Sequence, residues 1–210
     1  VFVCLTKLKD HANAGVPMAV KNRFGIAPNS IYGDCYDGAG NAKVDELSVS
    51  ARGDTFHKGK RQPPSGVPQG IDADSSRHWR GRVPRVTADL FAARPPDLCL
   101  VDGIETNRGG EGPWIRGTQP ITPHLLFAGR NGVCTDAVCT AAMGYNPAAH
   151  PGQFPFMGEN HLKLLAEKKI GTIELDKIDV RGLALNEAVH PFNPKRHRVG
   201  SPIFDEPGCP

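Results

Sequence analysis

The sequence lacks the features of several large protein classes. None of its apolar runs approaches the roughly 18 residues that a membrane-spanning helix needs. Its net charge of +3 is too small to indicate nucleic-acid binding. The Gly-x-Ser-x-Gly and His-Glu-x-x-His motifs are absent, and no Lys-Ser/Thr follows a Gly-rich turn. The sequence therefore predicts no membrane span, no nucleic-acid partner, and no hydrolase, zinc-protease or phosphate-loop chemistry of the common kinds.

Cysteine spacing excludes the usual cluster sites. The six cysteines form neither the C-x2-C pairs of zinc ribbons nor the run typical of ferredoxin clusters, so the chain has no iron–sulfur motif. Cys4 and Cys99 lie in apolar strand-like runs, and we expect them to be small core residues. Cys35 and Cys209 lie in loops where an oxidising compartment could pair them, and the sequence leaves that pairing open.

Strand-like and helical patterns alternate along the chain. The 24 glycines and 19 prolines predict long, shaped loops between them. We expect an α/β fold with a layered mixed or mainly parallel sheet flanked by helices. One domain is predicted over 1–182, followed by a Pro/His/Arg-rich, poorly packed tail at 183–210. The patterns predict strands at 1–5, 97–101, 125–128 and 173–180, and helices at 16–25, 83–93, 133–143 and 160–169.

Five polar side chains surround the loop between the first strand and the first helix: Lys7, Lys9, His11, Lys21 and Asn22. Ammonium groups and helix N–H groups recognise carboxylates or phosphates. Imidazole can move a proton because it titrates near neutral pH. We predict an anion site with Lys9, His11 and Lys21 as catalytic residues and Lys7 and Asn22 as ligand contacts. The alternative is that the lysines are solvated and His11 bonds a backbone carbonyl.

Four acidic residues, Asp102, Glu105, Glu111 and Asp136, follow strands or begin helices. Carboxylates so placed can hold a hard cation such as Mg²⁺ or Ca²⁺. We therefore predict a divalent-metal site here, facing the cationic loop across one cleft. For Asp136 the alternative is that it stabilises the positive end of its own helix.

The segment 52–85 is basic, with eight Lys/Arg against three Asp. One interpretation is a flap that brings Arg61 and Arg85 to an anionic ligand, with His57 or His78 as a metal ligand or proton donor. The other is a solvated basic loop. Aromatic residues are too sparse in this segment for a base-stacking surface.

Several segments resemble the "domain of unknown function 362" family. The main one is KLKDHANAGVPMAVKN at 7–22, since the family has a loop with lysine and histidine before a helix containing Lys-Asn. The resemblance continues at 83–90, 97–105, 110–113, 126–129, 135–138 and 143–144. It implies export by a twin-arginine signal to the periplasm or exterior. It also implies that the chain is the C-terminal half of a longer protein, a fragment or a processed product. Fusion of some relatives to iron–sulfur modules hints at redox chemistry.

Two functions follow as hypotheses. The first is an exported α/β protein that binds a small anionic ligand or a divalent metal, with proton-transfer or redox chemistry on it. The second is a non-catalytic assembly protein, in which 27–82 and the tail contact other chains in a homo-oligomer or contact a missing N-terminal half.

Overall fold

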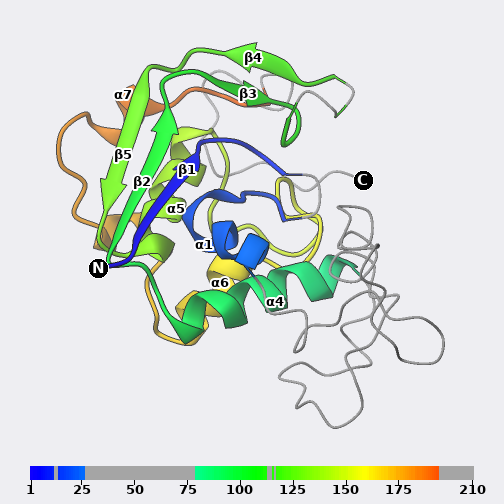
Figure 1. Cartoon of the computed structure of the whole chain (residues 1–210). Helices are drawn as coiled ribbons and strands as arrows, with labels where there is room; N and C mark the ends of the chain where they lie inside the picture. The colour runs from blue at the N-terminus through cyan, green and yellow to red at the C-terminus, as the bar shows by residue number, and fades with distance from the viewer. Residues whose placement is uncertain (12–13, 27–78, 113–114, 116, 194–210) are drawn as a thin grey trace, which may run out of the picture.

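A mixed three-stranded sheet forms the centre of the protein (Figure 1). The computed structural model describes residues 1–11, 14–26, 79–112, 115 and 117–193. The sheet has the order β1 (Val3–Lys7), β2 (Leu98–Gly103), β5 (Leu125–Gly129). Strand β2 runs parallel to β1 and antiparallel to β5. The predicted α/β fold with a mixed sheet and flanking helices is therefore confirmed.

Helices cover one face of this sheet in two successive layers (Figure 1). α1 (Met18–Lys21) and α5 (Gly132–Ala142) pack directly on the strands. α4 (Trp79–Ala93) and α6 (His161–Glu167) form the next layer. Most of α5 is buried because it lies between the sheet and α6. On the opposite face of the sheet, Leu5 and Leu126 are exposed among the described residues.

The remaining elements are short. The 3-10 helix η1 (Asn22–Ile26) continues directly from α1, so the helix predicted at 16–25 is divided into two types. β3 (Thr106–Arg108) and β4 (Gln119–Ile121) form a separate antiparallel hairpin above the sheet (Figure 1). No helix in the described ranges has the length and apolar content that crossing a membrane requires.

The strand predicted at 173–180 is wrong, because this segment forms the 3-10 helix η4 (Leu175–Lys177). The Lys177 N–H donates to the Glu174 carbonyl at 3.0 Å, and the two side chains form an ion pair at 2.6 Å. An i,i+3 bond of this kind closes a 3-10 turn and cannot coexist with an extended strand.

The beginning of the predicted tail is packed, in contrast to the expectation of poor packing from 183. α7 (Leu185–Ala188) contacts α5, and Phe192 is buried in the core. The N–H groups of His190 and Phe192 donate to the carbonyls of Ala142 and Met143 at 2.7 and 3.0 Å. One apolar side chain and two backbone bonds thus hold the chain to the end of α5.

A buried carboxylate from α5 fixes the short helix α1. The Ala19 N–H donates to Asp136 Oδ1 at 2.9 Å, and the Val20 N–H donates to Oδ2 at 2.8 Å. These amides have no partner within the helix, so Asp136 acts as its N-terminal cap from a distant part of the chain. Burial raises the pKa of Asp136 to about 7, although the two backbone bonds oppose the shift.

We predict that Asp136→Asn lowers the free energy of unfolding by about 1–3 kcal/mol, because the amide NH₂ cannot accept the second backbone bond. Urea denaturation measures the change. Asp176→Asn, on the exposed helix η4, is the matched control and should have little effect. Equal stabilities for the two variants would contradict the capping role.

The stability contributed by Asp136 should depend on pH. Between its ordinary pKa of 3.8 and the folded value of about 7, the folded protein holds a proton that the unfolded chain releases. The free energy of unfolding should therefore fall as pH rises through this window. Because Asp136→Asn removes the titration, the difference in free energy of unfolding between wild type and variant should narrow between about pH 4 and about pH 7. If urea denaturation gave the same difference in free energy of unfolding at every pH, the pKa of Asp136 would not be raised.

Candidate functional site

The loop after β1 is held tightly between two parts of the core. Leu8 is fully buried, and its carbonyl accepts the Thr106 hydroxyl. His11 and Gly15 exchange both backbone hydrogen bonds at 2.8 Å. Gly15 has a φ of 76°, and a Cβ there would lie 2.8 Å from Phe156 Cδ1. The glycine therefore permits both the turn and the close approach of this loop to residues 155–156.

Three of the predicted cationic residues lie around a single acidic residue, Glu111. We call Lys9, His11, Lys21 and Glu111 the Glu111 cluster. Lys9 Nζ donates to the Glu111 carbonyl at 3.0 Å, and His11 Nε2 lies 4.0 Å from Glu111 Oε1. Lys21 is close enough for the charges of both Lys9 and Glu111 to affect it. The cluster thus joins the loop after β1, the end of α1 and the loop between β3 and β4.

Lys21 is the most perturbed amine of this cluster. The pKa of Lys21 is lowered to about 8, mainly by burial. The charge of Glu111 opposes this shift, and the charge of Lys9 adds to it. The Lys21 Nζ lies 4.7 Å from the centre of the Phe24 ring, a cation–π distance. With this pKa, roughly a tenth of the Lys21 amine is unprotonated at pH 7, which is more than for an ordinary lysine.

The geometry assigns the tautomer of His11. The Ala14 N–H donates to His11 Nδ1 at 3.3 Å, so Nδ1 acts as an acceptor. The proton of the neutral ring then lies on Nε2, the nitrogen nearest the Glu111 carboxylate. The ring is only 9% exposed. The ring atom that can exchange a proton with the Glu111 cluster is therefore Nε2.

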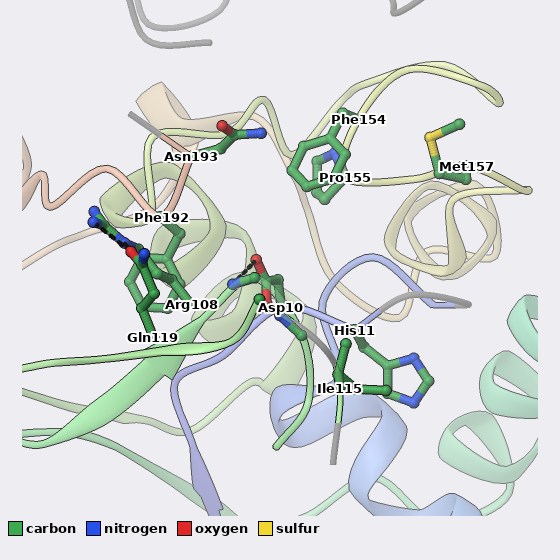
Figure 2. Close-up of a pocket in the computed structure, with 13 residues that line it drawn as sticks. Asp10, His11, Arg108, Ile115, Gln119, Phe154, Pro155, Met157, Phe192 and Asn193 are labelled. Carbon is green, nitrogen blue, oxygen red and sulfur yellow. Dashed lines mark hydrogen bonds between the residues drawn. The ribbon is translucent and has the colours of Figure 1, made fainter. Parts of the chain in front are cut away.

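A cavity of about 610 Å³ lies beside this cluster and shares His11 with it. Its polar wall includes Asp10, Arg108 and Gln119, and its apolar wall includes Phe154 and Phe192. Figure 2 shows Asp10 between the Arg108–Gln119 pair and His11, whose ring points away from Asp10. Arg108 donates to Gln119 Oε1 through Nε and Nη2 at 3.2 and 3.0 Å, which holds the guanidinium in place.

Asp10 positions the glycine-rich loop that carries Glu111. Its carboxylate accepts the N–H groups of Gly109 and Gly110 at 3.2 and 2.7 Å, and the Tyr145 hydroxyl at 3.3 Å. Burial raises the pKa of Asp10, while these bonds oppose the shift. Asp10 was not among the residues predicted from the sequence. The available signal was an acidic residue between Lys9 and His11, within the 7–22 segment.

A buried histidine lies near Lys21. His161, the first residue of α6, is fully buried, and neither ring nitrogen has a hydrogen-bond partner within the described residues. Burial lowers the pKa of His161 to about 3, and the charge of Lys21 adds to this effect. The sequence analysis treated 160–169 only as an amphipathic helix. A histidine among its apolar positions was the signal that could have identified it.

The other predicted ligand contacts lie outside the Glu111 cluster. Lys7 Nζ is 2.5 Å from Asp102 Oδ2 across the parallel β1–β2 register, and this bond lowers the pKa of Asp102. Asn22 Nδ2 donates to the Leu5 carbonyl at 3.4 Å and faces β1. Arg85 donates to both carboxylate oxygens of Glu159 at 2.8 and 2.7 Å. These contacts connect secondary-structure elements.

The predicted acidic set does not converge. Asp136 caps α1 and Asp102 bonds Lys7, while Glu105 is exposed and only Glu111 lies in the cluster. Within the described part of the chain, no three His, Cys, Asp or Glu side chains form a group able to hold a metal. The other predicted residues, Arg61, His57 and His78, lie outside the described residues.

The comparison with known families covers two thirds of the chain. The model of a family described as "Domain of unknown function (DUF362)" matches residues 1–141. The match includes every residue of the Glu111 cluster together with Asp10, Arg108 and Asp136. No curated protein and no solved structure matches the chain significantly.

We predict that Asp10→Ala frees the loop after β3, because the N–H groups of Gly109 and of the buried Gly110 lose their acceptor. The expected cost is about 1–3 kcal/mol for the buried Gly110 N–H and less for the N–H of the exposed Gly109. Hydrogen exchange should show faster exchange of the Gly109 and Gly110 amides. Tyr145→Phe removes only the hydroxyl bond and is the matched control, with a smaller effect expected. Unchanged protection of these amides in Asp10→Ala would show that other contacts hold the loop.

Proposed function

The chain belongs to the DUF362 family, and we propose that it binds a small anionic molecule at the Glu111 cluster and the adjoining cavity. The observation that carries this proposal is that Lys9, His11 and Lys21 gather around Glu111, and that His11 also lines the cavity. Among the described residues, two lysine side chains near one acidic side chain form a positively charged region, which attracts an anion.

The dimensions and chemistry of the cavity support a small ligand. A volume of about 610 Å³ lies within the range typical of small-molecule sites. Apolar walls from Phe154 and Phe192 suit a short carbon skeleton, while Arg108, whose guanidinium is held by Gln119, offers a cation in the same cavity. The ligand class that matches both features is a small organic acid with one or two carboxylates, or a small phosphate ester.

Proton transfer is the chemistry that these side chains suit best. His11 carries its neutral-ring proton on Nε2, and Glu111 can accept it or orient the ring. Redox chemistry and export to the periplasm or exterior are secondary proposals, which rest on the family resemblance. The divalent metal was predicted from the four acidic residues, which do not converge in the described part of the chain. The alternative function, a non-catalytic assembly protein, depends on segments that lie largely outside the described residues.

We predict that Lys9→Met and Lys21→Met each weaken the binding of oxalate or inorganic phosphate by about tenfold, because each removes one charge-assisted hydrogen bond. Isothermal titration calorimetry at low ionic strength measures both affinities. Lys169→Met is the matched control, since this lysine is exposed and outside the cluster. The Lys169→Met variant should bind oxalate and phosphate with the same affinity as the wild type.

The opposite result would support the assembly alternative. If the wild type bound no small anion, or if Lys9→Ala combined with His11→Ala left every affinity unchanged, the cluster would not be a binding site. A circular dichroism spectrum and an unfolding curve for each variant separate loss of binding from loss of fold.

A further inference from the structure

The wall of the cavity contains two opposite charges that form no ion pair with each other. The Asp10 carboxylate accepts hydrogen bonds from neutral donors, which are two backbone N–H groups and the Tyr145 hydroxyl. The Arg108 guanidinium donates to the neutral amide oxygen of Gln119. Across the part of the chain that the structure describes, neither charge is paired with a side chain of opposite sign, although both line the same cavity.

The Asp10 carboxylate is only 5% exposed. A carboxylate removed from water to this extent is normally paired with a cation. Burial raises the pKa of Asp10, and a positive charge beside the carboxylate would oppose that shift. A ligand with an ammonium group would supply this charge, whereas a second carboxylate in the ligand would be repelled by Asp10.

The two charged side chains come from adjacent parts of the cavity wall. The Gly109 N–H donates to Asp10 Oδ2 at 3.2 Å, and Gly109 directly follows Arg108, the last residue of β3. Figure 2 shows the two side chains beside each other in the wall. A single small molecule can therefore contact both of them.

The aromatic wall of the cavity lies next to the same carboxylate. Tyr145 donates its hydroxyl to Asp10, and its ring packs edge-on against Phe154 with the two ring centres 5.1 Å apart. Phe192 also lines the cavity and is buried in the core. A ligand whose ammonium group faces Asp10 would thus have an apolar surface within reach of its side chain.

We propose that the cavity binds a free α-amino acid with an apolar side chain, with its ammonium group on Asp10 and its carboxylate on Arg108. This inference rests on the proposed anion site and names the class of its ligand. Both charged groups of an α-amino acid are attached to one carbon, so they suit two neighbouring charges in one wall. The volume of about 610 Å³ also accommodates an aromatic side chain against Phe154 and Phe192.

The test is isothermal titration calorimetry of the whole chain with L-phenylalanine and with two analogues that each lack one charged group. 3-Phenylpropionate lacks the ammonium group, and phenethylamine lacks the carboxylate. We expect the wild type to bind phenylalanine about tenfold more tightly than either analogue, because each analogue loses one charge-assisted hydrogen bond. Glycine keeps both charges without the side chain, and it should also bind about tenfold more weakly. These comparisons use the wild type, so they do not depend on whether a variant folds.

Two variants assign the charged groups to residues. Arg108→Met should weaken the binding of phenylalanine about tenfold more than that of phenethylamine, which has no carboxylate. Asp10→Asn should weaken phenylalanine about tenfold more than 3-phenylpropionate. A variant that only disturbed the loop after β3 would weaken both ligands equally. Arg130→Met is the matched control, since this arginine is exposed and does not line the cavity, and it should bind phenylalanine as the wild type does.

The outcomes separate this inference from the proposal beneath it. If the wild type binds oxalate but binds phenylalanine no more tightly than either analogue, the amino-acid inference is overturned and the anion site stands. If it binds no small anion and no phenylalanine, both are overturned. Equal affinities for glycine and phenylalanine would reject the apolar class, since the aromatic wall would then contribute nothing.

Discussion

The position of α1 depends on one buried contact, the pair of hydrogen bonds from its first amides to Asp136. A helix of four residues has no stability of its own in water, and this one has no cap from a neighbouring side chain. Its buried residues, Met18 to Val20, pack on the sheet and α5. The two hydrogen bonds to Asp136 are directional, and they fix the rotation of α1 about its axis. Lys21 follows Val20 directly, so the same bonds determine where its amine leaves the core.

A second buried carboxylate performs the same task on the other side of the cluster. Asp10 binds two amides of the loop after β3, and this places Glu111 within reach of Lys9 and His11. In both cases burial raises the pKa of the acid, and bonds to backbone N–H groups partly offset the cost of removing the charge from water. The side chains of the Glu111 cluster are thus positioned by two acids that bind backbone N–H groups, Asp136 in the core and Asp10 in the wall of the cavity.

Local patterns predicted most of the fold. The strands at 97–101 and 125–128 and the helices at 133–143 and 160–169 followed from apolar spacing, with ends shifted by one or two residues. The prediction of a strand at 173–180 was wrong, because the apolar residues of this segment were interpreted as a strand at the edge of the sheet, whereas Leu175–Lys177 form a 3-10 helix. For the site, Lys9, His11 and Lys21 could be predicted from the sequence, because one loop and one helical turn connect them. The roles of Asp10 and Asp136 could not be predicted, since the backbone N–H groups that they bind lie about a hundred residues away in the sequence.

The buried His161 constrains any account of this site. A polar side chain left without a hydrogen bond costs about 1–3 kcal/mol, so its retention beside the Lys21 amine requires a compensating reason. A purely structural role would be served better by an apolar ring, because the imidazole packs edge-on against Phe156 as a phenyl ring could. Its nitrogens offer one donor and one acceptor without adding charge. Burial keeps this imidazole neutral, so it adds no second positive charge beside the Lys21 amine.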